Sequence, residues 1–199
     1  MSDMSAQLSF DDFAGPQALI DRYFFALFPP LNVASDVGRI AQDLRKEKSL
    51  HGPALLTERF HVTLLHLGDY AGARPDIVSI ARAVGDQLRA DLFDICFDRA
   101  ASFARKGGNA PLVLQGTDGV ESVIAFQRAL VNAVKRSSLH RLAKGSFTPH
   151  MTLLYDDQVV PAEPVAPVGW EVKEFVLVHS LIGKTQHTVL GRWALRTQP

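Results

Sequence analysis

Two segments of the chain place a histidine and a threonine two residues apart within an apolar run. The sequence HVTLL begins at His61, and HMTLL begins at His150. Side chains two apart on a β-strand share a face, so His61 would lie beside Thr63 and His150 beside Thr152. Two such pairs facing each other across a cleft would suit in-line attack at a phosphate. One imidazole would act as the base and the other as the acid, while the hydroxyls hold the phosphate oxygens.

Each motif alone is weak evidence for catalysis, because short motifs match often by chance and a strand histidine usually has a structural hydrogen bond. The packing of two similar core strands would explain the leucines that end each motif. It does not explain why both strands place a histidine and a threonine at the same two positions of one face. The repeat therefore favours a shared chemical role for the four polar side chains.

The composition is that of an ordinary globular protein, with 199 residues of which 47% are hydrophobic and 21% charged. The single cysteine, Cys96, excludes an intrachain disulfide and suits a reducing compartment. No apolar run is long enough to span a membrane, and no secretory signal pattern opens the chain. We therefore expect a cytoplasmic protein that does not contact the membrane.

The formal net charge is zero, from 21 basic and 21 acidic residues. Proteins that wrap long nucleic acids usually carry a basic surplus, so the balance favours a small nucleotide or one RNA end as the ligand. A basic cluster precedes the second motif and consists of Lys135, Arg136, His140, Arg141 and Lys144. This cluster is either a solvated helix end, where cations are favourable, or a surface that steers phosphate groups.

Hydrophobic periodicity and turn residues predict strands mixed with helices. The expected strands cover about 22–28, 59–67, 92–103, 111–115, the segment of the second motif, 170–182 and 187–196. Three helices are expected: one that ends near residue 48, one over about 75–89 and one over about 119–136. Three prolines between 156 and 169 predict a surface loop there.

The expected helices do not alternate strictly with the strands, so we predict an α+β fold with mainly antiparallel sheets and helices on the outer faces. The duplicated motif suggests two similar lobes with one motif strand in each. We predict a flexible N-terminal segment over residues 1–18 and a single bilobed domain over residues 19–199.

The two motifs and their flanks resemble the paired motifs of the 2H phosphoesterase superfamily. Within it the chain is most similar to the 2′-5′ RNA ligase-like proteins, which include the bacterial RNA 2′,3′-cyclic phosphodiesterases. The resemblance extends from about Arg22 to Leu195 and rests on RFHVTL at 59–64, FTPHMTL at 147–153, RYFFALFPP at 22–30, FVLVHS at 175–180 and WAL at 193–195.

This resemblance implies two antiparallel sheets related by a pseudo-two-fold axis, with the active site in the groove between the lobes. It implies that His61 and His150 are the catalytic pair, that Thr63 and Thr152 bind the phosphate, and that no metal or cofactor takes part. Members of the RNA cyclic phosphodiesterase branch often carry a basic residue shortly after the second motif. Here Tyr155 stands in that place. Its hydroxyl can donate to a phosphate oxygen, but a fixed positive charge is lost.

The predicted function is metal-independent hydrolysis of a 2′,3′-cyclic phosphate on an RNA end or small cyclic nucleotide, with 2′-5′ RNA ligation as the reverse reaction. The alternatives are an RNA-end or nucleotide binding module with little catalysis, and a metal hydrolase that loses activity on chelation. We expect a monomer. The sequence leaves open which histidine is the base. Strand alternation predicts that His66 points away from the groove, and His187 is interpreted as a packing or interface residue.

Overall fold

The computed structural model describes residues 19–103, 108–184 and 186–196, so the segment predicted to be flexible, 1–18, lies outside the described residues. The elements in these ranges, in chain order, are β1 (Ile20–Leu27), α1 (Leu31–Glu47), the 3-10 helix η2 (Thr57–Arg59), β2 (Val62–Ala71), α2 (Pro75–Gln87), β3 (Phe93–Ser102), β4 (Ala110–Gln115), α3 (Glu121–Lys135), the 3-10 helix η3 (His140–Leu142), β5 (His150–Asp156), β6 (Glu163–Val172), β7 (Glu174–Leu181) and β8 (Gln186–Ala194).

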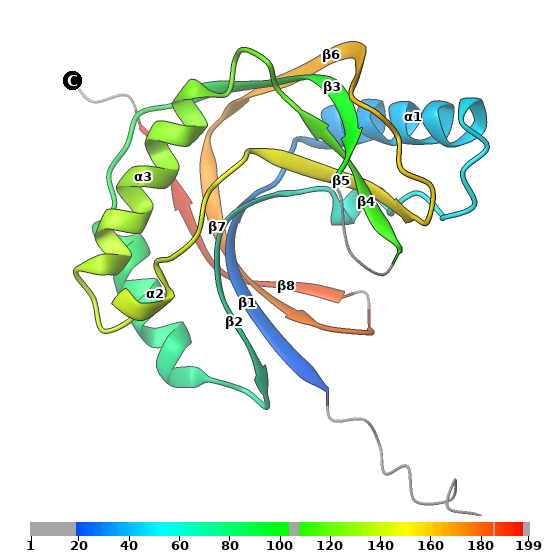
Figure 1. The fold of residues 1–199 in the computed structure, drawn as a ribbon. Helices are drawn as coiled ribbons and strands as arrows, with labels where there is room; N and C mark the ends of the chain where they lie inside the picture. Colours follow the sequence, from blue (N-terminus) through cyan, green and yellow to red (C-terminus); the bar gives the residue numbers. More distant parts are fainter. Residues whose placement is uncertain (1–18, 104–107, 185, 197–199) are drawn as a thin grey trace, which may run out of the picture.

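The described strands form one antiparallel sheet in the order β6-β3-β4-β5-β2-β1-β7-β8 (Figure 1). We call β2, β1, β7 and β8 the first half, and β5, β4, β3 and β6 the second half. Each half contains a strand–helix–strand unit that ends in a motif strand, β1–α1–β2 in the first half and β4–α3–β5 in the second. The predicted α+β class is therefore confirmed, and the two expected sheets are the two halves of one continuous sheet.

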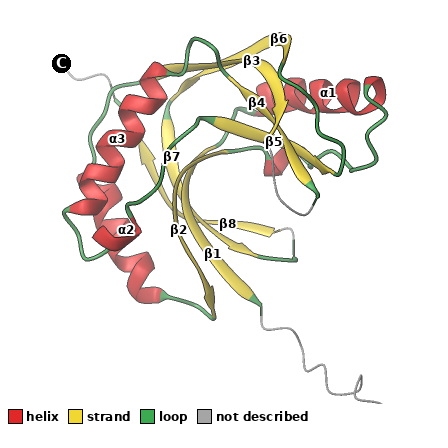
Figure 2. Ribbon diagram, in the orientation of Figure 1, coloured by secondary structure: helices red, strands yellow, loops and turns green. Residues whose placement is uncertain are grey.

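The helices lie on the outer face of the curved sheet (Figure 2). Helix α1 packs against β6 and β5, α2 against β8, and α3 against β3 and β2. The main hydrophobic core fills the space between these helices and the sheet. No helix within the described ranges is long and apolar enough to cross a membrane.

The opposite face of the sheet, which we call the inner face, carries a smaller apolar cluster in the first half. The cluster consists of Phe24, Ala26, Val176 and Val178, with Phe28 packed against it. Strand alternation in β1 produces the division, because Tyr23, Phe25 and Leu27 point into the main core and the residues between them do not. The inner face of the first half is thus apolar at its centre.

Each motif strand contains a β-bulge directly after its threonine. The extra residue is Leu64 in β2 and Leu153 in β5. A bulge shifts the alternation of side chains by one position, so two consecutive leucines face the main core in each strand. The next residue then returns to the inner face. These residues are His66 in β2 and Tyr155 in β5.

The prediction that His66 points away from the groove was therefore wrong. His66 pairs directly with Phe24 of the inner face, and its side chain is exposed. The prediction assumed unbroken alternation from His61, and the bulge at Leu64 reverses it. The two bulges lie at the same position of the five-residue motif, so the halves also correspond in the local backbone of their motif strands.

The predicted surface loop over 156–169 was also wrong in its second part, because β6 begins at Glu163. Prolines are tolerated here for two reasons. Strand β6 is at the edge of the sheet and pairs only with β3 among the described strands, so half of its N–H groups need no partner. A register shift opposite the segment from Phe97 to Arg99 accommodates the residues around Pro167.

Candidate active site

The two motif strands are neighbours at the junction of the halves, where Val62 of β2 pairs with Met151 of β5. Both of these residues are fully buried in the main core. Extending the antiparallel register by one residue in each direction places His61 opposite Thr152, and His150 opposite Thr63. Directly opposed side chains on one face of a sheet are about 5 Å apart at Cβ.

The structure therefore brings together the four residues that the sequence singled out. They share the inner face at the place where the first and second halves meet, and all four are half-buried. Neither Thr63 nor Thr152 forms a side-chain hydrogen bond with the described residues. Both hydroxyls are consequently available to a ligand on this face.

Both imidazoles are held by the same backbone contact. The Nδ1 atom of His61 lies 2.7 Å from the carbonyl oxygen of Arg59, and Nδ1 of His150 lies 2.7 Å from that of Thr148. A carbonyl oxygen only accepts hydrogen bonds, so each Nδ1 carries the proton. In each neutral ring Nε2 then has the free lone pair, and it can accept a proton from a ligand.

The segments before the motifs fix this geometry. Residues Thr57–Arg59 form η2, and the extended backbone of Phe60 then leads into β2. Before β5, Pro149 restrains Thr148 to an extended conformation. In both halves the carbonyl two residues before the histidine consequently points back at its ring.

The surroundings of the two rings differ. His61 contacts the rings of Phe24, Phe28 and His187, with centroid distances of 5.1, 6.1 and 5.2 Å. Among the described aromatic residues, His150 contacts one ring, that of Phe103, at 4.9 Å.

The crowded setting changes the charge of His61. Although part of its surface reaches solvent, burial lowers its pKa from 6.5 to about 4. The hydrogen bond to the Arg59 carbonyl opposes this shift, and the positive charges of Arg59 and His150 add to it. His61 is therefore a neutral imidazole near pH 7.

His187 of β8 is a member of the site that sequence reasoning missed. Its ring packs on Phe24 at 5.7 Å and meets His61 nearly edge to face. Burial lowers its pKa to about 4, and electrostatic interactions with His61 and Arg59 act in the same direction. The interpretation of His187 as a packing residue describes its contact with Phe24 but not its contact with His61. That contact depends on how the β7–β8 hairpin folds over β1, which no local pattern encodes.

A group of polar residues lies farther along the inner face. Arg22 of β1 donates from Nε and Nη2 to the two carboxylate oxygens of Asp69, at 2.7 and 2.6 Å. Nε2 of His66 lies 2.9 Å from the same carboxylate. These hydrogen bonds, that from Arg22 foremost, lower the pKa of Asp69 to about 2. Tyr155 is 41% exposed and near enough to Arg22 to help raise its pKa.

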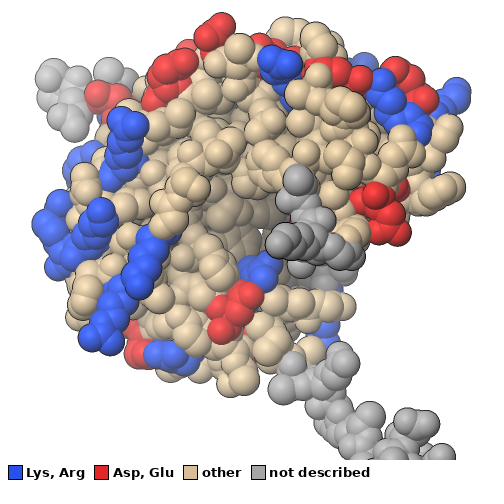
Figure 3. Space-filling view, viewed as in Figure 1, with Lys and Arg blue, Asp and Glu red and all other residues tan. Residues whose placement is uncertain are grey.

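Figure 3 shows that this side of the molecule is hollowed near its centre, and that most of the surface around the hollow is neither acidic nor basic. Lysine and arginine side chains gather to one side of it, over α2 and α3. The basic cluster predicted from the sequence is exposed at the end of α3 and in the segment that follows. Its role in steering phosphate groups stays a prediction.

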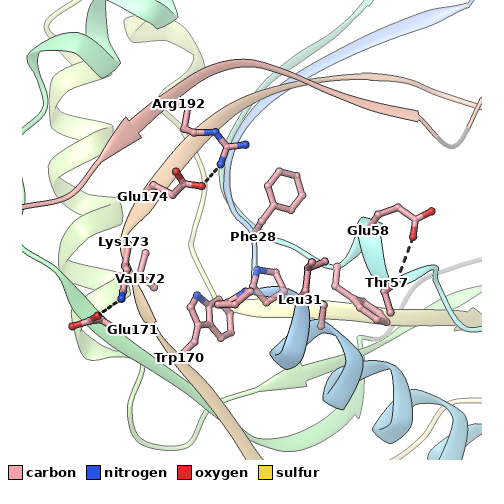
Figure 4. A pocket seen from close by; sticks show the side chains of 14 residues that line it. Phe28, Leu31, Thr57, Glu58, Trp170, Glu171, Val172, Lys173, Glu174 and Arg192 are labelled. Carbon is pink, nitrogen blue, oxygen red and sulfur yellow. Dashed lines mark hydrogen bonds and ion pairs between the residues drawn. The ribbon is translucent and has the colours of Figure 1, made fainter.

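A cavity of about 580 Å³ lies beside Phe28, whose ring also contacts His61. Figure 4 shows Phe28 and Trp170 on its walls, with the start of α1 at Leu31 across from them. Two ion pairs, Arg192 with Glu174 and Lys173 with Glu171, border the cavity. Apolar walls with charged groups at the edge suit a flat organic group.

The described parts of the chain contain no group of three or more His, Cys, Asp or Glu side chains that could hold a metal ion. The thiol of Cys96 is half-buried on β3 and forms no disulfide.

A family model described as the 2′-5′ RNA ligase superfamily matches residues 29–181. The apo structure of Escherichia coli LigT is 22% identical and has a TM-score of 0.70, covering 90% of this chain and 99% of that chain. The structure of E. coli LigT complexed with ATP is also 22% identical, with a TM-score of 0.68 over 89% of this chain and 99% of that one.

The structure of TT0787 of Thermus thermophilus is 21% identical, with a TM-score of 0.67 over 89% of this chain and 100% of that chain. At these identities the structural matches demonstrate a common fold. A search of curated protein sequences found no match.

Proposed function

Because the chain belongs to the 2′-5′ RNA ligase superfamily, we propose that it is a metal-independent phosphodiesterase that hydrolyses a 2′,3′-cyclic phosphate. The observation that carries the proposal is the quartet at the junction of β2 and β5. Two imidazoles with free Nε2 atoms and two hydroxyls without other partners among the described residues meet on one face. These are the groups that in-line displacement at phosphorus requires.

In this mechanism His61 is the base. Its low pKa keeps Nε2 unprotonated near pH 7, so it can remove a proton from water as the water oxygen bonds to phosphorus. His150 is the acid, and its protonated Nε2 donates to the ribose oxygen as the bond from phosphorus to that oxygen breaks. Each proton transfer contributes about 10²- to 10⁴-fold to the rate. Exchange with solvent then restores both imidazoles.

Thr63 and Thr152 donate hydrogen bonds to the non-bridging phosphate oxygens. Each hydroxyl lies across the strand pair from the histidine of the other motif. A phosphate between the two imidazoles is consequently within reach of both hydroxyls. Donors placed in advance stabilise the charge that develops on these oxygens in the transition state.

The substrate is an RNA end or a small cyclic nucleotide. Solved structures of E. coli LigT complexed with 3′-AMP and with phosphate support a ligand of this size. The cavity beside Phe28 receives the nucleobase, since its walls are apolar and Phe28, which lines it, also contacts His61. In the reverse direction the same acid and base would exchange roles and join a 2′-5′ bond. The cytoplasmic location and monomeric state stay predictions.

The test is hydrolysis of 2′,3′-cyclic nucleotides by the full chain, with and without a chelator. The expected result is turnover that survives chelation and is lost in His61→Asn and His150→Asn. The matched control is His140→Asn, which alters an exposed histidine of η3 outside the junction. Binding of 3′-AMP without turnover would instead favour a nucleotide-binding module, and loss of turnover on chelation would favour a metal hydrolase.

A further inference from the structure

Two buried polar atoms beside His61 have no hydrogen-bond partner. They are Nε of Arg59 and Nδ1 of His187, and they are the buried side-chain atoms without a partner among the residues the structure describes. They come from distant elements, η2 and β8, yet both belong to residues that interact with the His61 imidazole. The carbonyl oxygen of Arg59 lies 2.7 Å from Nδ1 of His61, and the ring centroids of His187 and His61 are 5.2 Å apart.

An unsatisfied buried donor costs about 1–3 kcal/mol. Native proteins leave few such groups, and a concentration of them next to reactive side chains indicates a ligand that completes the hydrogen bonds. Arg59 has only N–H donors and forms no ion pair with the described residues. The missing partner of Arg59 is therefore an acceptor, and an anion satisfies both its charge and its hydrogen bond.

We propose that Arg59 and His187 form an anion subsite on the His61 side of the groove, which binds a non-bridging oxygen of the substrate phosphate. The Nε–H of Arg59 donates to this oxygen, and the Nδ1–H tautomer of His187 donates beside it. This inference rests on the proposed function for the identity of the anion. It assigns phosphate recognition to two residues outside the duplicated motif.

The charge balance of the inner face supports Arg59 as the cation that binds phosphate. Tyr155, the inner-face residue that follows the second motif, offers a hydroxyl and no positive charge. Arg22 lies near Tyr155, but both carboxylate oxygens of Asp69 neutralise it. The positive charge of Arg59 acts on both His61 and His187, and Arg59 forms no ion pair with an acid among the described residues.

The position of Arg59 also couples binding to catalysis. Its main chain orients His61 through the carbonyl contact, and the charge of its side chain acts on the same ring. An anion bound by the guanidinium is therefore held on the His61 side of the groove. The short helix η2 fixes both parts of Arg59 relative to β2.

The experiment measures binding of inorganic phosphate to the full-length protein by calorimetry, together with kcat/KM on a 2′,3′-cyclic nucleotide. Arg59→Met keeps the apolar stem of the side chain, and we expect it to raise the phosphate Kd about tenfold or more. Arg59→Lys should restore part of the affinity. His187→Phe keeps the ring shape without Nδ1 and should raise Kd by about threefold to tenfold.

The matched control is Arg39→Met, which removes an exposed arginine that pairs with Asp36 on α1. It should leave the phosphate Kd unchanged. Nitrogen shifts of the His187 ring should move when phosphate is added to the parent protein, and this readout needs no variant. Phosphate affinity within twofold of the parent in both Arg59→Met and His187→Phe overturns the inference.

The low-pH side of the pH profile of kcat/KM, its acid limb, distinguishes a loss of the Arg59 charge from a loss of packing. Removing the charge of Arg59 should move this limb to higher pH, because that charge lowers the pKa of His61. Arg59→Lys keeps the charge and should leave the limb near that of the parent, whereas a loss of packing at His61 would move the limb upward in both variants, because burial also lowers this pKa. If the parent binds phosphate through Arg59 but hydrolyses no cyclic phosphate, the proposed function fails and the subsite stands.

Discussion

The two motif regions have the same backbone setting and different surroundings. His61 and His150 each donate from Nδ1 to the carbonyl two residues earlier, at the same distance. Of the two, His61 is the one enclosed by three other rings, and its pKa falls to about 4. The comparison shows that the repeated motif fixes which nitrogen is free, while the residues of the neighbouring strands bury His61 and lower its pKa.

The largest expected effect on activity comes from replacing each histidine in turn. We expect His61→Asn and His150→Asn to lower kcat by about 10²- to 10⁴-fold, because each removes one proton transfer. The double variant should be little worse than either single one, since the two groups act in one step. Steady-state kinetics with circular dichroism to verify folding would measure this. A His61→Asn variant with activity within tenfold of the parent would rule out His61 as the base.

The threonines provide the next test, because the comparison treats them as equivalent. Thr63→Val and Thr152→Val keep the shape of the side chain and remove one donor each. We expect each to lower kcat by about 10²-fold, the usual cost of losing one donor to a developing oxyanion. The measurement is kcat and KM on the same cyclic nucleotide. A large loss for one threonine and none for the other would show that the phosphate sits nearer one half.

The enclosed imidazoles make the stability of the protein depend on pH. In the unfolded chain a histidine binds a proton below about pH 6.5, whereas folded His61 and His187 stay neutral until about pH 4. Between these values the unfolded state binds more protons, so stability falls as the pH drops. Thermal unfolding from pH 7 to pH 4.5 should show a falling Tm. His187→Phe should make the fall less steep, and a slope equal to that of the parent would contradict the assignment.

The smallest expected effect concerns Tyr155, the residue that distinguishes the second motif strand. Tyr155→Phe removes one exposed hydroxyl and should change kcat/KM by less than about threefold, since an exposed donor competes with water. Tyr155→Arg places a fixed charge on the inner face and should lower the phosphate Kd several-fold. Calorimetry would measure both. An unchanged Kd in Tyr155→Arg would mean that residue 155 lies outside the phosphate site.

The sequence predicted the parts of this site that depend on local patterns. Alternation over two residues was sufficient to place His61 with Thr63, and His150 with Thr152, and the mixed order of elements predicted the α+β class. The resemblance to the 2H phosphoesterases joined the two motifs into one site. These inferences need only the two-residue alternation of side chains on a β-strand and the duplication of the motif.

The parts that were missed depend on tertiary structure. The bulges at Leu64 and Leu153 reversed the alternation, and their sequences offer no glycine or other bulge signal. The prolines of β6 predicted a loop because the sequence does not tell that β6 is an edge strand. His187 approaches His61 only through the packing of β8 over β1, across a separation of more than a hundred residues.

The junction of the halves has a mechanical consequence. Among the described residues, β2 and β5 are held in register by the single pair Val62 and Met151, whereas the other neighbouring strands share longer ladders. A rotation of one half against the other would use this pair as its pivot. Groups at a pivot move least, so the reacting side chains would keep their spacing while the far ends of the groove open or close. A change in the width of the groove would then leave the spacing of the four motif side chains unchanged.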